Sequence, residues 1–199
     1  MPNFLHGVNV TEINEGINRV KTSSSSVIGV IGTAPEATED DFSLNTPVLI
    51  NGSYTAAAKL GTLGTLPGAL DGILAQTGAV VVVVRVAEGI ASGEGNEAVT
   101  AAEATINNVI GSVSANGTYS GVYSFLAAKS MLGITPRILC APGFSTTEVV
   151  TELNTIAGRL RAIVVADCPA NETRPLIVTS EHSGKSRFCF AAGYAPGDM

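Results

Sequence analysis

The sequence predicts an α/β domain: a mainly parallel, mixed sheet covered by helices on both faces and preceded by an extended N-terminal β arm. One observation behind this prediction is the unbroken run Val80–Val84, which continues into Arg-Val-Ala between Gly78 and Gly89. A short β-branched run of this kind is typical of a strand buried on both faces, and such strands occur mainly in parallel sheets. A second observation is that strand-like and helix-like segments alternate along the chain, as they do in βαβ units.

Length and composition agree with one domain of this class. The chain has 199 residues, of which 45% are hydrophobic and 14% are charged, so it can bury a core. Its formal net charge of −6, without a basic stripe, argues against a nucleic-acid partner. The first residues lack the basic and apolar regions of a signal peptide, and the valine run is too short to cross a bilayer. We therefore expect no membrane insertion.

Residues 1–25 are predicted to form an N-terminal arm and linker. Apolar and polar residues alternate over residues 8–13, which predicts a short strand with Val8, Val10, Glu12 and Ile13. Ser23, Ser24 and Ser25 belong to a polar tract that suits a flexible linker. Residues 14–16 suit a turn and residues 17–20 a second strand, which would make a hairpin. Because an isolated hairpin is marginally stable in water, this arm has to pack on its own domain or on another chain.

The domain itself is assigned to residues 26–199, and its first half begins with three strands and two helices. We predict a buried strand at 27–32, a solvated acidic loop at 36–41, a short strand at 47–50, helices at 53–60 and 65–75, and the valine strand at 80–87. Ser53 is a favoured residue for a helix N-cap. Pro67 suits the first turn of the helix that starts at Thr65.

The second half continues the alternation of helices and strands. We predict helices at 97–110 and 122–132 with a turn region at 111–121 between them, a strand at 136–142, a helix at 145–160, and strands at 162–167 and 187–192. Ser145 and Glu148 have the spacing of a capping box. The short connections between strand and helix favour a mainly parallel sheet.

Motifs with catalytic or ligand chemistry are weak throughout. Residues 179–186 end in Gly-Lys-Ser, as a phosphate-binding loop does, but Thr179 replaces the glycine that the backbone turn needs, and a strand follows Lys185 instead of a helix. A polar β-turn is the better interpretation. His6 and His182 lie far apart, without a Cys or carboxylate at metal-ligand spacing. The three cysteines are isolated in apolar sequence and are typical of reduced core residues: Cys140, Cys168 and Cys189.

One position remains a candidate for catalysis. Asp167 is the last residue of a predicted parallel strand, at the edge where α/β enzymes place catalytic groups, but capping or a loop hydrogen bond explains it more simply. The sequence therefore predicts no catalytic residues, no cofactor and no metal. The alternative is a doubly wound nucleotide- or small-molecule-binding enzyme domain that uses the strand ends near Ala34, Glu88, Pro142 and Asp167.

The arm favours a structural protein that assembles with other chains. A detached strand can join the sheet of a neighbouring chain by β-augmentation. If each subunit lends its arm to the next, the contacts are head-to-tail, and such contacts generate rings or helical filaments.

Several stretches resemble the contractile tail sheath proteins of myophages, especially the P2-like type. The resemblance rests on residues 4–16, with Phe-Leu-His-Gly-Val, on 44–50, on 76–89, with Val-Arg-Val-Ala-Glu-Gly, on 129–142 and on 157–162. It covers most of residues 4–165. Sheath proteins of this family are usually longer, with a C-terminal half that carries a tube-facing domain and a C-terminal arm. The resemblance therefore implies an N-terminal portion of such a protein.

This resemblance implies a structural role and no enzymatic activity. The implied partners are other sheath subunits, the tail tube protein, the baseplate and the tail terminator, in a virion tail that is assembled in the host cytoplasm. Sheath subunits surround the tube and contract to drive it through the host envelope. The N-terminal arm of the family joins a sheet on a neighbouring subunit, a role that falls here on residues 8–13, with Ser23–Ser25 as a hinge. A secretion-apparatus sheath or a phage-derived bacteriocin shares this mechanism.

Overall fold

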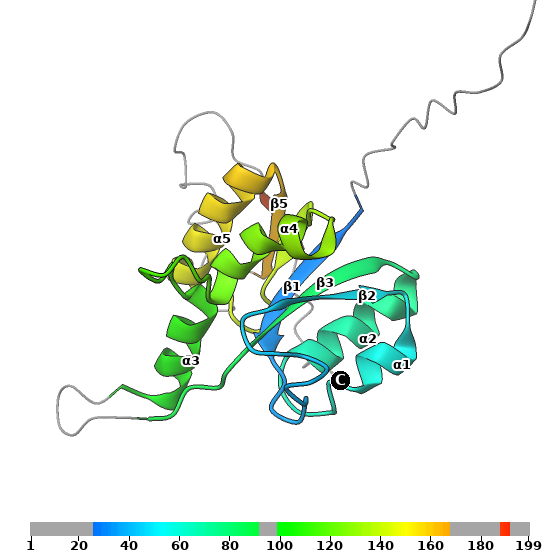
Figure 1. Cartoon of the computed structure of the whole chain (residues 1–199), viewed down its shortest axis with the longest axis horizontal. Coiled ribbons are helices and arrows are strands. Elements are labelled where there is room, and N and C mark those ends of the chain that lie inside the picture. Colours follow the sequence, from blue (N-terminus) through cyan, green and yellow to red (C-terminus); the bar gives the residue numbers. More distant parts are fainter. Residues whose placement is uncertain (1–25, 92–98, 168–187, 192–199) are drawn as a thin grey trace, which may run out of the picture.

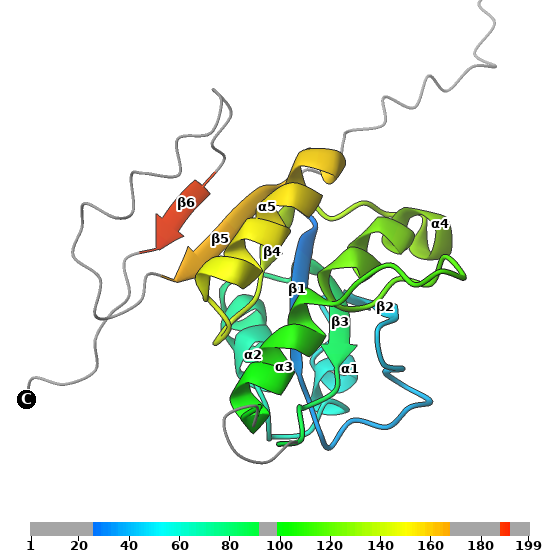
Figure 2. The same ribbon diagram turned by 90° about the vertical axis from the view of Figure 1, so that its left-hand side faces the viewer.

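The computed structural model describes residues 26–91, 99–167 and 188–191, with the backbone alone for Asp167 and for the last of these segments. Within these residues the strands form one six-stranded sheet in the order β2-β3-β1-β4-β5-β6 (Figures 1 and 2). The strands are β1 (Ile28–Thr33), β2 (Pro47–Asn51), β3 (Val80–Val86), β4 (Ile138–Cys140), β5 (Ile163–Asp167) and β6 (Phe188–Ala191). The pairing of β2 with β3 is antiparallel, and the other neighbours are parallel. The predicted mainly parallel, mixed sheet is confirmed.

Helices cover both faces of the sheet, as the sequence predicts. They are α1 (Tyr54–Ala58), α2 (Leu66–Gln76), α3 (Ala101–Ile110), the 3-10 helix η2 (Gly121–Ala127), α4 (Ala128–Leu132) and α5 (Thr147–Leu160). The α1–α2 layer packs on one face, where Leu66, Leu70 and Leu74 meet Val81 and Val83. The other four helices pack on the opposite face (Figures 1 and 2).

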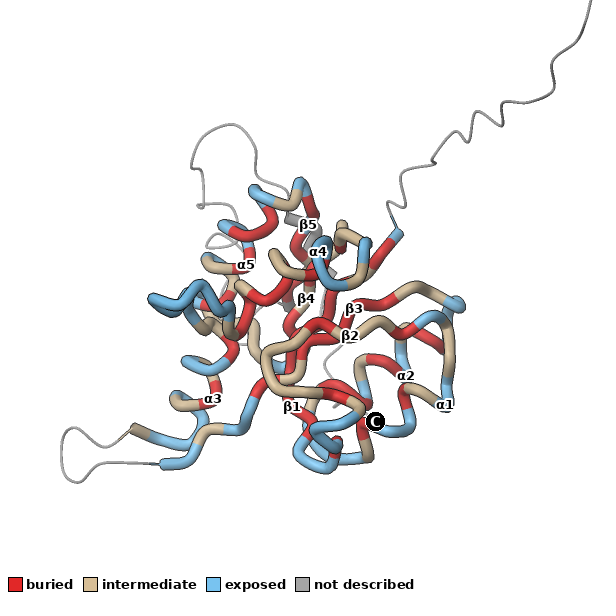
Figure 3. Tube along the Cα trace, in the orientation of Figure 1, coloured by how far each residue is buried: buried red, intermediate tan, exposed pale blue. Residues whose placement is uncertain are grey.

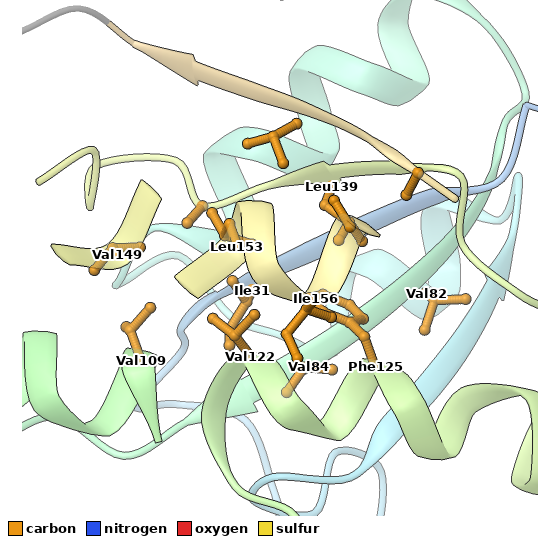
Figure 4. Packing of buried hydrophobic residues seen from close by; sticks show 14 of the residues in the cluster. Ile31, Val82, Val84, Val109, Val122, Phe125, Leu139, Val149, Leu153 and Ile156 are labelled. Atoms are coloured by element: carbon orange, nitrogen blue, oxygen red, sulfur yellow. The ribbon is translucent and has the colours of Figure 1, made fainter. Parts of the chain in front are cut away.

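The valine run supplies both cores. Val82 and Val84 of β3 lie with Phe125 of η2 and Ile156 of α5 in the larger core, and all four are fully buried (Figure 4). Val81 and Val83 turn to the α1–α2 side. Figure 3 shows β1 and β3 buried along most of their length, which confirms a strand enclosed on both faces. Successive valines point alternately into the two cores, so both faces of the strand are apolar. For this reason the sequence shows no alternation of polar and apolar residues here.

The helix starts predicted in the first half are confirmed. The Ser53 hydroxyl accepts a hydrogen bond from the Ala56 amide at 3.3 Å and caps α1. Pro67 lies in the first turn of α2. The predicted end of α1 at Leu60 is wrong, because the helix ends at Ala58 and Lys59 is its C-cap.

The predicted α-helix over 122–132 is also wrong in part. Residues 121–127 form a 3-10 helix, and only Ala128–Leu132 is α-helical. Three fully buried residues, Val122, Phe125 and Ala128, recur at a spacing of three. A 3-10 helix has three residues per turn, so this spacing places all three on one face toward the core.

The capping box predicted at the start of α5 does not form. The helix begins at Thr147 with Thr146 as N-cap, which makes no side-chain capping bond. A capping box does occur at α3, where the Thr100 hydroxyl and the Glu103 carboxylate each accept from the other residue's backbone amide, at 3.2 Å and 2.9 Å. Both sites have a Ser or Thr three residues before a Glu. At α5, however, the helix begins one residue later than this pattern predicts, with Thr146 as N-cap in place of Ser145.

The acidic loop after β1 is exposed, as expected, but it is also anchored by Arg85 of β3. The Arg85 guanidinium donates to the carbonyl oxygens of Ala37 and Phe42 and lies 3.0 Å from a carboxylate oxygen of Glu39. Its side chain is 11% exposed. The one charged residue in the valine strand therefore holds the loop against the end of the sheet.

Candidate interaction surfaces

The residues predicted for the inter-subunit arm and its hinge lie outside the described residues. They are Val8, Val10, Glu12, Ile13, Ser23, Ser24 and Ser25. The division into an arm at 1–25 and a domain at 26–199 therefore stays a prediction, and so do the roles of these side chains. Lys185 and the Gly-Lys-Ser segment also lie outside this part of the chain.

The strand ends named for the enzyme alternative lie at the carboxyl edge of the parallel sheet. There the side chain of Thr65 occupies the space between the ends of β1 and β4. A Cβ atom on Gly32 would lie 2.3 Å from the Thr65 hydroxyl, and one on Gly143 would lie 3.1 Å from its methyl group. Open α/β sheets bind ligands in a crevice at this kind of position. In this chain the Thr65 side chain fills the part of this position that faces α2.

The N-terminus of α2 is used to hold the helix on the sheet. The Thr65 amide donates to the Thr33 carbonyl oxygen at 3.0 Å, and the Thr33 amide donates to the Thr65 hydroxyl at 3.2 Å. Pro67 has no amide hydrogen to offer. This arrangement lends no support to a phosphate site at α2, because such sites need amides directed at the ligand.

Glu88 lies near the same edge, beside a shallow cavity of about 360 Å³ lined also by Thr33, Thr105 and Phe144. The Thr105 hydroxyl accepts from the Gly89 amide at 2.9 Å and donates to the Ala101 carbonyl oxygen at 2.7 Å. Asp167 ends β5, and its side chain is not described. Over residues 26–91 and 99–167, no group of three or more His, Cys, Asp or Glu could hold a metal ion. The described helices include none long and apolar enough to span a membrane.

An apolar groove lies between α2 and the sheet, with a cavity volume of about 480 Å³. Its floor consists of Ile28 of β1, Cys140 of β4 and Val165 of β5. Its wall is the side of α2 that carries small residues: Gly68, Ala69 and Gly72. A Cβ atom on either glycine would meet nothing within 4 Å, so this flank of the helix is open. We call this feature the α2 groove.

The α2 groove marks a part of the sheet that the described helices leave uncovered. Val164 and Ala166 of β5 belong to the core beneath α5, whereas Val165 points to the other face. Ile163, two residues earlier on that face, is 40% exposed. Parallel strands are usually buried on both faces. An open apolar face on β4 and β5 is therefore a candidate contact surface.

The sequence does not predict the α2 groove. Its three floor residues come from strands far apart in the chain, and only the fold brings them together. The small residues at 68, 69 and 72, opposite the buried leucines of α2, are the one local signal that could have indicated a close approach to this helix.

A second candidate surface is the turn at residues 112–120, which projects from the α3–η2 side of the sheet (Figure 1). Val113 and Tyr119 form an antiparallel bridge there and are 48% and 38% exposed. Within the turn, the Ser114 amide donates to the Thr118 carbonyl oxygen at 2.9 Å. The region was predicted only as a turn.

The base of the 112–120 turn is closely packed. A Cβ atom on Gly111 would lie 2.2 Å from the Ser120 carbonyl oxygen, and one on Gly121 would lie 2.4 Å from the Val109 carbonyl oxygen. The Asn45 side chain accepts a hydrogen bond from the Gly121 amide at 2.8 Å. The turn therefore presents an aromatic and a branched side chain on a fixed backbone.

The electrostatics near α2 depend on Glu36. One carboxylate oxygen of Glu36 accepts hydrogen bonds from the Thr62 amide at 2.6 Å, from the Thr62 hydroxyl at 3.1 Å and from the Leu63 amide at 3.3 Å. The bond from the Thr62 amide is the main cause that lowers the pKa of Glu36 below its usual value. This carboxylate fixes the turn that leads into α2.

Comparisons with known proteins point to one family. A family model described as the N-terminal region of domain III of tail sheath protein Gp18 matches residues 25–86. The chain is 41% identical over 162 residues to the tail sheath protein of Escherichia phage P2, an alignment that covers 81% of this chain and 40% of that protein. It is 36% identical over 171 residues to the major tail sheath protein of Serratia phage KSP20, covering 86% of this chain and 42% of the relative.

A further relative is a prophage major tail sheath protein of Pseudomonas aeruginosa strain UCBPP-PA14. It is 32% identical over 185 residues, which cover 92% of this chain and 45% of the relative. The chain thus spans less than half the length of these curated relatives.

Proposed function

Because this chain belongs to the tail sheath protein family, we propose that it acts as a structural subunit of a contractile tail sheath that polymerises around the tail tube. The observation that carries the proposal is the 41% identity to the phage P2 tail sheath protein over 162 residues. On contraction, the sheath drives the tube through the host cell envelope. Energy for this movement is stored in subunit contacts, and the chain is not an enzyme.

The proposed partners are other sheath subunits, the tail tube protein, the baseplate and the tail terminator. The site of action is the virion tail, assembled in the host cytoplasm. The surface features support this role over a ligand-binding one. Thr65 fills part of the crevice at the carboxyl edge, and the cavity that remains there beside Glu88 is shallow. The α2 groove has an apolar floor, and the 112–120 turn presents two exposed apolar side chains.

We assign the contact between successive subunits to the N-terminal arm. Residues 8–13 add a strand to the sheet of a neighbouring subunit, and Ser23, Ser24 and Ser25 form the hinge. What supports this proposal is the alternation of residues 8–13 and the position of the polar tract directly before β1. Main-chain pairing supplies affinity in such strand addition, and the alternate side chains supply specificity.

Negative-stain electron microscopy of the protein expressed from its complete reading frame tests both proposals. We expect hollow, ribbed cylinders of uniform width. Deleting residues 2–20 should abolish the cylinders while circular dichroism and the melting temperature of the α/β domain stay unchanged. A matched pair sharpens the test: Val8→Ser with Val10→Ser should also prevent assembly, whereas Asn9→Ser with Thr11→Ser, on the other face of the strand, should not.

Two outcomes contradict these proposals separately. Normal cylinders from the deletion variant would disprove the role of the arm and leave the sheath subunit in place. Monodisperse globular particles from the undeleted protein, at concentrations where sheath proteins polymerise, would disprove the sheath function itself.

A further inference from the structure

The α2 groove and the 112–120 turn lie on opposite faces of the same sheet. Helix α2 packs in the core of one face, and the segments that flank the turn, through Val109 and Val122, pack in the core of the other. Figure 1 shows the turn projecting away from the sheet on the side opposite α2. A subunit therefore cannot insert its own turn into its own groove.

The two features match in chemistry. The turn offers two exposed apolar side chains, Val113 and Tyr119, and the groove offers an apolar floor and a wall of small residues. Polar side chains at one end of the groove, Gln76 and Thr77, can meet a tyrosine hydroxyl. Aromatic residues that enter a pocket are typical anchors of protein interfaces.

The backbone of the turn is ordered before it binds anything. Ser112 and Ser120 are linked by three hydrogen bonds of 2.8–3.0 Å: two join the backbone of Ser112 to the Ser120 side chain, and one joins the backbones. A rigid segment loses less conformational entropy on docking than a flexible one. An exposed nine-residue turn whose backbone is fixed by these hydrogen bonds is suited to binding a partner surface.

We propose that the 112–120 turn of one subunit docks in the α2 groove of a second copy of the same chain, with Tyr119 as its anchor. The inference rests on the proposed sheath function, in which the neighbours of a subunit are copies of itself. Because turn and groove lie on opposite faces, the contact is heterologous, so each added subunit presents a new groove and a new turn. Contacts of this type propagate as open helices or close as rings.

Chemical cross-linking tests the contact in the protein expressed from its complete reading frame. Cys140 already lies in the groove floor, and the other two cysteines of this chain are replaced by Cys168→Ser and Cys189→Ser, together with any cysteine elsewhere in the reading frame. Val113→Cys then places a thiol beside Tyr119 without removing it. With a short bismaleimide we expect a ladder of dimers, trimers and larger products on a denaturing gel.

Met131→Cys is the matched control for cross-linking. Met131 is 58% exposed on α4, on the same side of the sheet as the turn, but outside it. It should give no ladder under the same conditions. Equal ladders from both variants, a product that stops at the dimer, or no product from Val113→Cys in assembled protein would each overturn the inference.

Tyr119→Ser tests the anchor directly. We expect the concentration needed for assembly to rise by about tenfold or more, as for an interface hot spot, with an unchanged melting temperature of the dispersed subunit. Assembly at an unchanged concentration would overturn the turn–groove contact while leaving the sheath function intact. A Cys140 thiol that resists maleimide in dispersed subunits would show that the same chain covers the groove, which also contradicts the inference.

Discussion

The two faces of the sheet are covered to different extents. On one face, four helices extend from β3 to β5 and enclose Val82, Val84, Leu139 and Val164. On the other, α1 and α2 cover β1, β2 and β3, and the apolar residues of β4 and β5 remain partly open. A face that is enclosed within the subunit stabilises the fold, whereas an open apolar face is available for a partner. The difference predicts that mutations of similar chemistry will have different consequences on the two faces.

The largest expected effect separates two adjacent residues of β5. Val164 is 1% exposed beneath α5, and Val165 lines the α2 groove. Val164→Asp should destabilise the fold by about 5 kcal/mol or more, because an unpaired carboxylate would be buried. Val165→Asp should leave the subunit folded and prevent assembly. Urea denaturation and electron microscopy measure the two results.

If these two variants behaved alike, the predicted difference between the enclosed face and the open face would be wrong. A folded Val164→Asp subunit would mean that the α5 layer is easily displaced. An unfolded Val165→Asp subunit would mean that the groove face is enclosed within the chain.

A smaller effect is expected from two isoleucines truncated in the same way. Ile156 of α5 is fully buried, and Ile163 of β5 is 40% exposed on the open face. Ile156→Ala should lower the free energy of unfolding by about 2–5 kcal/mol through loss of buried contacts and formation of a cavity. Ile163→Ala should lower it by less than about 1 kcal/mol, since surface substitutions have small effects. Equal losses, measured by urea denaturation with unchanged m-values, would contradict the assignment of the open face.

The smallest expected effect is on stability at low pH, and it depends on Glu36. The lowered pKa of Glu36 means that the folded state binds a proton at this group less readily than the unfolded state. Its stabilisation is therefore fully present above the unfolded pKa, about 4.3, and is lost as the pH falls through the lowered folded pKa. Glu36→Gln should flatten the fall in melting temperature below about pH 4.3. Asp71→Asn, at an exposed carboxylate on α2, controls for the loss of one charge; an unchanged acid response of Glu36→Gln would exclude this role.

Much of the fold could be predicted because its signals are local. The valine run, the Ser53 cap and Pro67 each act through their own backbone or the next turn, and their predicted elements are confirmed. The 3-10 segment was missed because Val122, Phe125 and Ala128 suit a helix of either period until burial is known. The role of Arg85 depends on a loop that ends more than forty residues earlier in the chain.

The candidate surfaces were harder to predict because they depend on relations in space. Tyr119 is one exposed aromatic residue in a polar turn, and nothing nearby in the sequence indicates that the turn is rigid. In the sequence, Cys140 and Val165 look like ordinary strand residues. Only the fold shows that α2 leaves them at the bottom of an open groove. The family resemblance predicted assembly, but it gave no information on which faces of this domain remain open.

The position of β1 between β3 and β4 also has a consequence for synthesis on the ribosome. Gly29 and Cys140 contact each other across 111 residues of sequence. At roughly 5–20 residues per second, β1 therefore waits about 6–22 seconds for its second neighbour to be made. During that interval an apolar strand has at least one unpaired edge in a crowded cell, where it is prone to aggregate or to require a chaperone. The yield of folded subunits should therefore depend on translation speed between β1 and β4.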